Sequence, residues 1–278
     1  MKQNKDNICR VDTDKAWNIL HSRLEEDRLL PGETTPSSYR TLQWVIAVAA
    51  VLAGVILSIF YFPKNKDNSL FTLQNTENTG TLVTMLEDGS TVYLATQASI
   101  SYPTVFANNQ RKVELNGNAL FCVTQDEKRP FVIETNGMTI EVVGTIFAVQ
   151  SSPGNPFELS VKQGKVNVHS ENNQAIVPVE AGETVQLNTG GLRKYSTPDV
   201  RIFSYFTDKM CFKDEKLNNI VHAINTIYGA PAIIAEESLN SRTLTVTFEN
   251  NSVETMTELI CLALNLEQII KQDTIFIR

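Results

Sequence analysis

The longest apolar stretch of the chain is residues 42–62, with the sequence LQWVIAVAAVLAGVILSIFYF and no charged side chain. A helix rises about 1.5 Å per residue, so this stretch matches the thickness of the hydrocarbon core of a bilayer. Aromatic residues lie near both of its ends, where amphipathic rings prefer the headgroup level. The pattern predicts a transmembrane helix that stays in the mature protein. A buried core helix is the alternative.

The basic residues around this segment slightly favour a cytoplasmic N-terminus. Arg23, Arg28 and Arg40 precede it, whereas Lys64 and Lys66 follow it. The sequence therefore predicts a single-pass membrane protein in which residues 1–41 form a cytoplasmic tail and residues 42–62 form the span.

The tail contains the pattern of one short amphipathic helix. Asp12 or Asp14 can cap its N-terminus. Its apolar stripe, at helical spacing, consists of Ala16, Trp17, Leu20 and Leu24. A lone helix of this length is only marginally stable in water, so we expect the stripe to bind a partner protein. Contact with the membrane surface is the alternative.

From residue 81 to about residue 187, apolar and polar residues alternate at the period of a β-strand, with turn residues between the runs. Residues 82–86 and 92–94 flank Asp88-Gly89, a strong hairpin signal. Further strands are predicted at 113–115, 120–123, 131–134, 139–143, 146–149, 159–161, 166–168, 176–179 and 184–187. This pattern predicts an all-β antiparallel sandwich or jelly roll.

The pattern changes after residues 188–199, which contain Gly190-Gly191 and Pro198 and are predicted to be a linker. Two β-α-β units follow. The first has strands at 210–212 and 232–235 around a helix that Gly229 closes. The second has a strand at 243–248, a helix with Asn251 and Glu254 as a capping pair, and strands at 266–270 and 274–277. Residues 204–278 are thus predicted to form a small α+β domain.

Charge and cysteine content exclude several classes of function. The formal net charge of −7 falls after the predicted span, so no basic face for nucleic acid is expected. No histidine cluster or nucleotide-binding loop predicts a cofactor or a metal. The cysteines, Cys9, Cys122, Cys211 and Cys261, have no metal-ligand spacing and are predicted to be small buried side chains. A Cys211–Cys261 disulfide is the alternative.

Several motifs of the β region resemble those of a known family. They are LEDGSTVYL (86–94), RKVELNGNALFCV (111–123), PFVIET (130–135), EVVGTIFAV (141–149) and VKQGKVNV (161–168). In this order they resemble the FecR family of transmembrane anti-sigma regulators, over residues 75–190. Asn118 and Leu120 stand where an acidic residue and an aromatic are usual. Residues 204–278 are similar to the C-terminal domain that accompanies many members, which resembles the signalling domain of TonB-dependent transporters.

The resemblance implies an inner-membrane regulator with a periplasmic C-terminus and no enzymatic activity. Its tail would hold an extracytoplasmic-function sigma factor through Trp17, Leu20 and Leu24. Its C-terminal module would receive the periplasmic signalling domain of an outer-membrane TonB-dependent transporter. The last two predicted strands are expected at an open sheet edge, and the predicted contacts there are Leu266, Ile270, Ile275 and Ile277. The alternative for residues 274–277 is a structural strand inside the sheet. A membrane-anchored periplasmic binding or scaffold protein is the alternative.

One segment is a candidate for covalent chemistry. Some family members resemble self-cleaving proteins at a Gly-Thr bond, which here is Gly144-Thr145. The Thr145 hydroxyl would attack the preceding carbonyl carbon to form an ester, which water then opens, if the backbone is strained. The alternative is structural: Gly144 makes a turn and Thr145 starts a strand.

Overall fold

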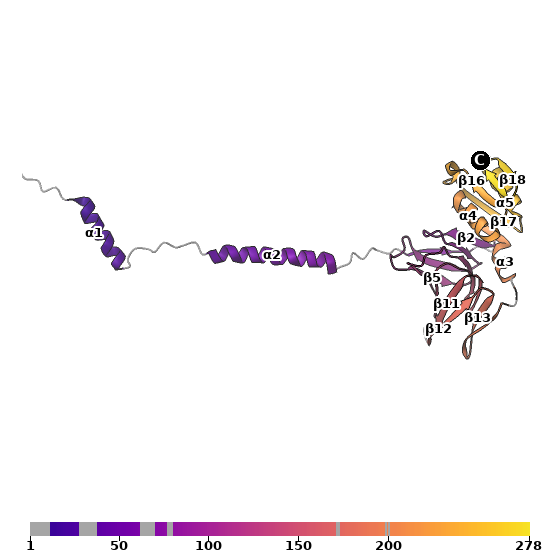
Figure 1. Ribbon diagram of the computed structural model, residues 1–278, viewed down its shortest axis with the longest axis horizontal. Coiled ribbons are helices and arrows are strands. Elements are labelled where there is room, and N and C mark those ends of the chain that lie inside the picture. The colour runs from indigo at the N-terminus through magenta and orange to yellow at the C-terminus, as the bar shows by residue number, and fades with distance from the viewer. Residues whose placement is uncertain are drawn as a thin grey trace, which may run out of the picture. The chain divides into compact units, whose positions relative to one another are not determined.

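The computed structural model describes residues 12–27, 38–61, 70–76, 80–170, 173–197, 199 and 201–278. The chain divides into two compact units, residues 1–66 and residues 67–278 (Figure 1). Each unit is described by itself below.

The first unit contains the helices α1 (Thr13–Glu26) and α2 (Ser38–Tyr61). Asp12 is the N-cap of α1, because its side chain accepts a hydrogen bond from the Lys15 amide at 3.2 Å. Residues 43–54 of α2 have described side chains. Over the side chains that the structure describes, no helix combines the length and the apolar character needed to cross a membrane.

The second unit is built mainly from two large sheets. Over the described residues, the first is seven-stranded, in the order β1 (Leu70–Gln74), β4 (Ser99–Pro103), β5 (Arg111–Asn116), β7 (Phe131–Thr135), β8 (Met138–Val142), β11 (Lys165–Ser170) and β12 (Asn173–Glu180). The second is nine-stranded, in the order β14 (Gly191–Ser196), β13 (Glu183–Asn188), β10 (Glu158–Gln163), β9 (Ile146–Gln150), β6 (Ala119–Cys122), β3 (Thr91–Leu94), β2 (Thr81–Met85), β15 (Lys209–Lys216) and β17 (Thr243–Glu249).

The first hydrophobic core joins these two sheets as a β-sandwich. Val113 and Leu115 of β5 point into this core, and Glu114 between them is exposed. The strands predicted between residues 82 and 187 are confirmed. β1 and β4 were not predicted. The linker predicted at 188–199 is wrong, because β14 within it pairs with β13 along its full length.

A second hydrophobic core lies on the opposite face of the nine-stranded sheet. Val83, Tyr93 and Leu120 point into it from the sandwich. Two helices cover this face, α3 (Arg201–Thr207) and α4 (Leu217–Tyr228), with Phe203 and Phe206 of α3 buried. Strands β3 and β6 are therefore buried on both faces. This explains why all four residues of each strand are inaccessible.

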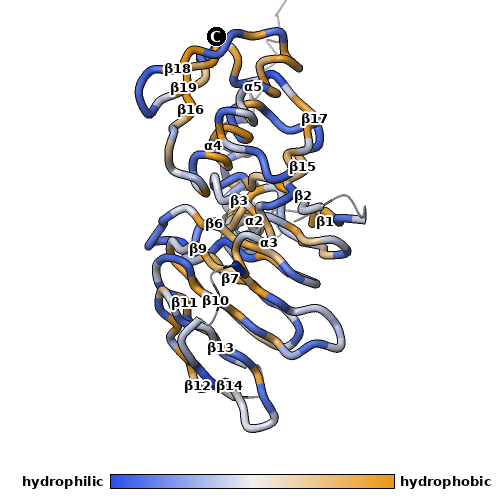
Figure 2. Tube along the Cα trace, turned by 90° about the vertical axis from the view of Figure 1, so that its right-hand side faces the viewer, coloured by the Kyte–Doolittle hydropathy of each residue, from blue (hydrophilic) through white to orange (hydrophobic). Residues whose placement is uncertain are grey.

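The C-terminal module shares a sheet with the sandwich. β15 pairs in parallel with β2, with Met210 opposite Thr81 and Cys211 opposite Leu82. β15 also pairs with β17, whereas β16 (Ala232–Ala235), β19 (Thr274–Ile277) and β18 (Gln268–Lys271) form a separate sheet. α4 and α5 (Val253–Leu264) lie between these two sets of strands (Figure 2). The two predicted β-α-β units are present, but they do not form one open sheet.

The structure corrects one predicted helix end and decides between the two predicted cysteine states. Gly229 is the C-cap of α4, as expected. The N-cap of α5 is Ser252, whose hydroxyl accepts from the Thr255 amide, and Asn251 instead accepts from the Glu249 amide. The capping pair predicted for Asn251 and Glu254 is therefore wrong. Cys122, Cys211 and Cys261 are buried free thiols, which confirms the predicted small buried side chains and excludes the alternative Cys211–Cys261 disulfide. Cys9 lies outside the described residues.

A buried ion pair joins several turns of the sandwich. Arg111 Nη1 lies 2.7 Å from Asp88 Oδ2, and both side chains are inaccessible. The guanidinium also donates to the carbonyls of Arg129, Thr124 and Val143, and it lies 5.4 Å from the centre of the Phe131 ring. Two buried charges are tolerated because each is paired and its remaining hydrogen-bonding groups have partners.

A second buried polar contact ties the sandwich to the C-terminal module. The Tyr93 hydroxyl of β3 donates to the Ala223 carbonyl of α4 at 3.0 Å. Burial raises the pKa of Tyr93 well above its usual value, and the nearby Cys122 and Tyr228 add to the shift. The phenol therefore stays neutral in the folded protein under conditions where an exposed tyrosine ionises.

We predict that Tyr93→Phe lowers the free energy of unfolding by about 1 kcal/mol at neutral pH, because the Ala223 carbonyl loses a buried donor. Above about pH 10 the unfolded chain releases the Tyr93 proton more readily than the folded chain does. The free energy of unfolding of the parent then falls with rising pH, and the difference in this free energy between parent and Tyr93→Phe becomes smaller. Urea unfolding at several pH values measures this. Tyr205→Phe, at an exposed tyrosine of α3, serves as the control.

Candidate functional site

The predicted sigma-binding residues lie on α1, which has no buried residue. Trp17 and Leu20 are 64% and 50% exposed, and Leu24 is half-buried. They lie on one side of the helix, and Ile19, which is 52% exposed, lies on the other. The helix thus presents an apolar stripe that nothing in the described part of its own unit covers.

The predicted reactive segment lies in a closely packed turn between β8 and β9. The Val123 amide donates to the Thr145 carbonyl, and the Asp126 amide donates to the Val143 carbonyl. The Val143 carbonyl also accepts from Arg111. The turn is therefore held to the segment after β6 by backbone bonds and by the same guanidinium that pairs with Asp88.

Close packing explains why residue 144 is glycine. A Cβ atom at Gly144 would lie 2.7 Å from the Cα of Gln125, which is a clash with backbone. The φ of Gly144 is not positive, so no strain of that kind marks the bond. Thr145 is buried, and its hydroxyl donates to the Lys165 carbonyl at 3.0 Å. This geometry favours the structural interpretation of Gly144-Thr145.

The expected open edge at residues 274–277 is wrong. β19 is the central strand of the small sheet, with β16 parallel on one side and β18 antiparallel on the other. Ile275 and Ile277 are buried in the second core and are not surface contacts. Leu266 precedes β18 and packs partly against the same core. The chain terminus did not leave its last strand at an edge because β16 pairs with it.

The two outer strands of the small sheet differ in how available their backbone is. On β16, the side-chain amide of Asn225 donates to the Ile233 carbonyl and accepts from the Ile233 amide, each at 2.8 Å. This contact blocks the edge as a neighbouring strand would. On β18, Glu267 and Arg278 exchange both backbone bonds, so the alternation of an antiparallel ladder directs the amides of Gln268 and Ile270 outward.

The exposed side chain of Ile270 is a second feature of the β18 edge. It shares a face with Ile275 and Ile233, which are opposite one another along the sheet. Those two isoleucines are inaccessible, whereas Ile270 is 57% exposed. The apolar layer therefore ends uncovered at β18. β17 is the other outer strand of the module, but its exposed side chains are threonines and a glutamate.

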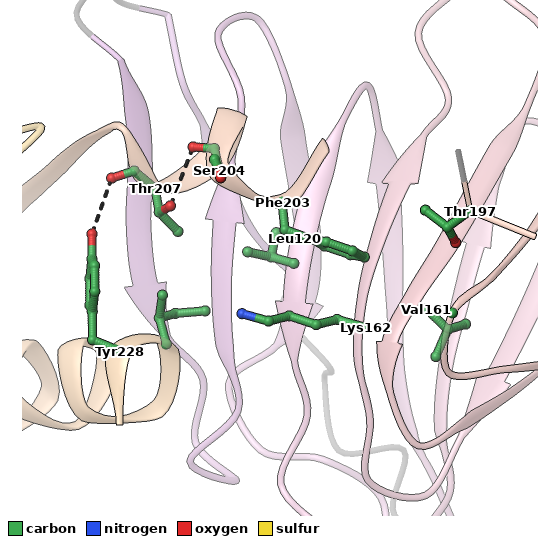
Figure 3. Close-up of a pocket in the computed structure, with 10 residues that line it drawn as sticks. Leu120, Val161, Lys162, Thr197, Phe203, Ser204, Thr207 and Tyr228 are labelled. Carbon is green, nitrogen blue, oxygen red and sulfur yellow. Dashed lines mark hydrogen bonds between the residues drawn. The ribbon is translucent and has the colours of Figure 1, made fainter. Parts of the chain in front are cut away.

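A cavity of about 400 Å³ lies where the sandwich meets α3 and α4 (Figure 3). Leu120, Val161, Phe203 and Ile227 form its apolar part. Its polar side chains are Lys162, Thr197, Ser204, Thr207 and Tyr228. Burial raises the pKa of the neighbouring Cys122 thiol to about 12, with Lys162 opposing part of the rise. The thiol is thus protonated and is not a nucleophile at neutral pH.

The sequence carries a signal for this junction that the strand predictions did not use. The runs 91–94 and 119–122 contain apolar residues on both faces of a strand, which is typical of a strand covered on both sides. The unusual Leu120 is one of them. Within the described part of the chain, no group of three histidine, cysteine or acidic side chains could hold a metal ion.

The fold and junction define a two-sheet sandwich with an α+β module built onto its edge strand. The family model described as FecR protein matches residues 73–167, and the model described as FecR, C-terminal matches residues 209–277. The chain therefore belongs to the FecR family. This family assignment confirms the resemblance found from the sequence motifs.

The chain is also similar to two crystal structures of a candidate anti-sigma factor from Parabacteroides distasonis. One is 22% identical, covers 75% of this chain and 98% of that chain, and has a TM-score of 0.47. The other is 21% identical, covers 76% of this chain and 98% of that chain, and has a TM-score of 0.45. No curated protein matches the chain.

We predict that Thr145→Ala lowers the free energy of unfolding by about 1 kcal/mol, because the hydrogen bond to the Lys165 carbonyl is lost. Thr145→Ser should retain most of that stability. Purified parent and variant should each give one full-length band on a denaturing gel. Two fragments from the parent and none from Thr145→Ala would instead establish self-cleavage at this bond.

Proposed function

We propose that this protein is a single-pass anti-sigma factor of the inner membrane. In this proposal α1 binds an extracytoplasmic-function sigma factor in the cytoplasm, residues 42–62 cross the membrane, and residues 67–278 lie in the periplasm. The observation that carries the proposal is the exposed stripe of Trp17, Leu20 and Leu24, in a chain that belongs to the FecR family. A short helix with an uncovered apolar stripe gains most of its stability from a partner.

The periplasmic input is proposed to be the signalling domain of an outer-membrane TonB-dependent transporter. Its docking site is the β18 edge, where the outward amides of Gln268 and Ile270 and the exposed Ile270 side chain are adjacent. An added strand would take up the free backbone groups, and its side chains would cover the end of the apolar layer. Asn225 blocks the opposite edge and so limits this sheet to one strand addition.

The shared sheet restricts how such a signal can travel. Moving the C-terminal module alone would break the β2–β15 pairing and expose the second core. The unit 67–278 is therefore expected to respond as one body. A single apolar helix offers no second conformation to relay, so the signal would be a change in force, association or proteolysis. Cutting within the membrane is the simplest way to release the tail.

For the cytoplasmic partner, we predict that Trp17→Ala weakens sigma-factor binding more than about tenfold, because burial of a large apolar side chain contributes about 1.5–3 kcal/mol. Ile19→Ala removes another exposed apolar side chain, from the opposite side of α1, and should leave affinity unchanged. The measurement is titration of the full chain with each extracytoplasmic-function sigma factor of the organism that makes this protein. Equal affinities for both variants would contradict the assignment, and no binding by the parent would favour a scaffold without sigma regulation.

For the periplasmic partner, we predict that Ile270→Pro abolishes transporter binding while the protein stays folded. Proline there removes an amide that faces away from β19, a position that edge strands tolerate. Ile270→Val should bind normally. Ile269→Pro removes a ladder bond to β19 and should destabilise the small sheet. Binding to the transporter's signalling domain and urea unfolding separate these effects. Retained binding by Ile270→Pro would contradict docking at the β18 edge, and β17 would be the next edge to test.

A further inference from the structure

The cavity between the sandwich and the helices α3 and α4 has features of a ligand site that the proposed relay does not use. Its walls come from β6, β10, the turn before β13, the end of β14, α3 and α4. Its volume of about 400 Å³ lies within the usual range for small-molecule pockets. A ligand here would contact the sandwich and the helices at once.

The chemistry of the lining is asymmetric. None of the described residues that line the cavity is acidic, although the chain carries a net charge of −7. Lys162 is the cation among these described lining residues, and its ammonium group forms no ion pair or hydrogen bond within the part of the chain that the structure describes. Lys165, on the next strand, is by contrast paired with Glu180. The cavity therefore offers a positive charge without a partner.

Hydroxyl groups add further polar contacts. Figure 3 shows the Lys162 side chain lying across the cavity, with its amine end toward the side on which Tyr228 lies. The Tyr228 hydroxyl donates to the Thr207 carbonyl at 3.5 Å, which is long enough to be replaced by a better acceptor. The Ser204 hydroxyl has no partner among the described residues. Leu120, Val161 and Phe203 also line the cavity and provide apolar surface.

We propose that this cavity binds a small organic anion with an apolar body, with the anionic group at Lys162 and hydrogen-bonded to the hydroxyls of Tyr228 and Ser204. The apolar body would lie against Leu120, Val161 and Phe203. Such a ligand would stabilise the junction between sandwich and module, because it contacts both. This site is independent of the sigma-binding helix and of the β18 edge.

Octanoate and octanamide test the proposal, since they share a chain and differ in charge. Calorimetric titration of the full chain should show octanoate binding, and octanamide should bind about tenfold more weakly, as expected for loss of a charge-assisted hydrogen bond. Lys162→Gln should weaken octanoate binding by about the same factor and leave octanamide binding unchanged. Octanoate should also raise the unfolding temperature of the parent.

Two further variants locate the site. Lys165→Gln removes an exposed lysine outside the cavity and should bind octanoate as the parent does. Ser204→Phe replaces a small side chain that lines the cavity with a bulky ring and should exclude both ligands. The proposal is overturned if the parent does not bind octanoate, if octanamide binds equally well, or if Lys162→Gln and Lys165→Gln behave alike. Octanoate binding that survives Ser204→Phe would place the ligand elsewhere and would also overturn it.

Discussion

The ion pair between Arg111 and Asp88 holds together parts of the sandwich that are distant in sequence. One guanidinium contacts the hairpin at Asp88, the segment after β6 through Thr124, and the turn after β8 through Val143. Neither charge is accessible, so removing either partner would leave the other buried and unpaired, which is strongly destabilising. Arg111 and its partners Asp88, Phe131 and Val143 each belong to a different motif of the family, so this one buried arginine connects several of those motifs.

A second constraint is that the nine-stranded sheet belongs to both halves of the unit. Its strands β2 and β3 supply Leu82 and Val92 to the sandwich core and Val83 and Tyr93 to the core beneath the helices. Among the described residues, the buried apolar side chains of the C-terminal module form one cluster with Val83, Tyr93 and Leu120 of the sandwich. The family's two matched segments are thus parts of one folded body in this protein.

The sequence predicted what depends on neighbouring residues and missed what depends on distant ones. Asp88-Gly89, the alternating strands and the two C-terminal helices follow local rules, and they are present. The residues around Gly191 resembled a linker because two adjacent glycines interrupt the alternation of apolar and polar residues. In the structure Gly191, at a φ of 100°, is the first residue of the strand β14. The position of β19 depends on β16, and the buried state of Arg111 depends on Asp88. The cavity draws on six separate segments and carries no local motif.

The parallel pairing of β15 with β2 also determines the order in which the protein can be completed. Tyr93 and the Ala223 carbonyl that it contacts are 130 positions apart, so the chain must be made at least as far as α4 before this contact can form. Until then the edge of β2 and the apolar face around Leu120 are open to other chains. Long-range strand pairing of this kind forms slowly and leaves partly folded chains prone to aggregate. A chain truncated before β15 would keep strands β1 to β14 but would leave the edge of β2 and the apolar face around Leu120 without the C-terminal module. The module therefore protects the domain on which it is built from aggregation.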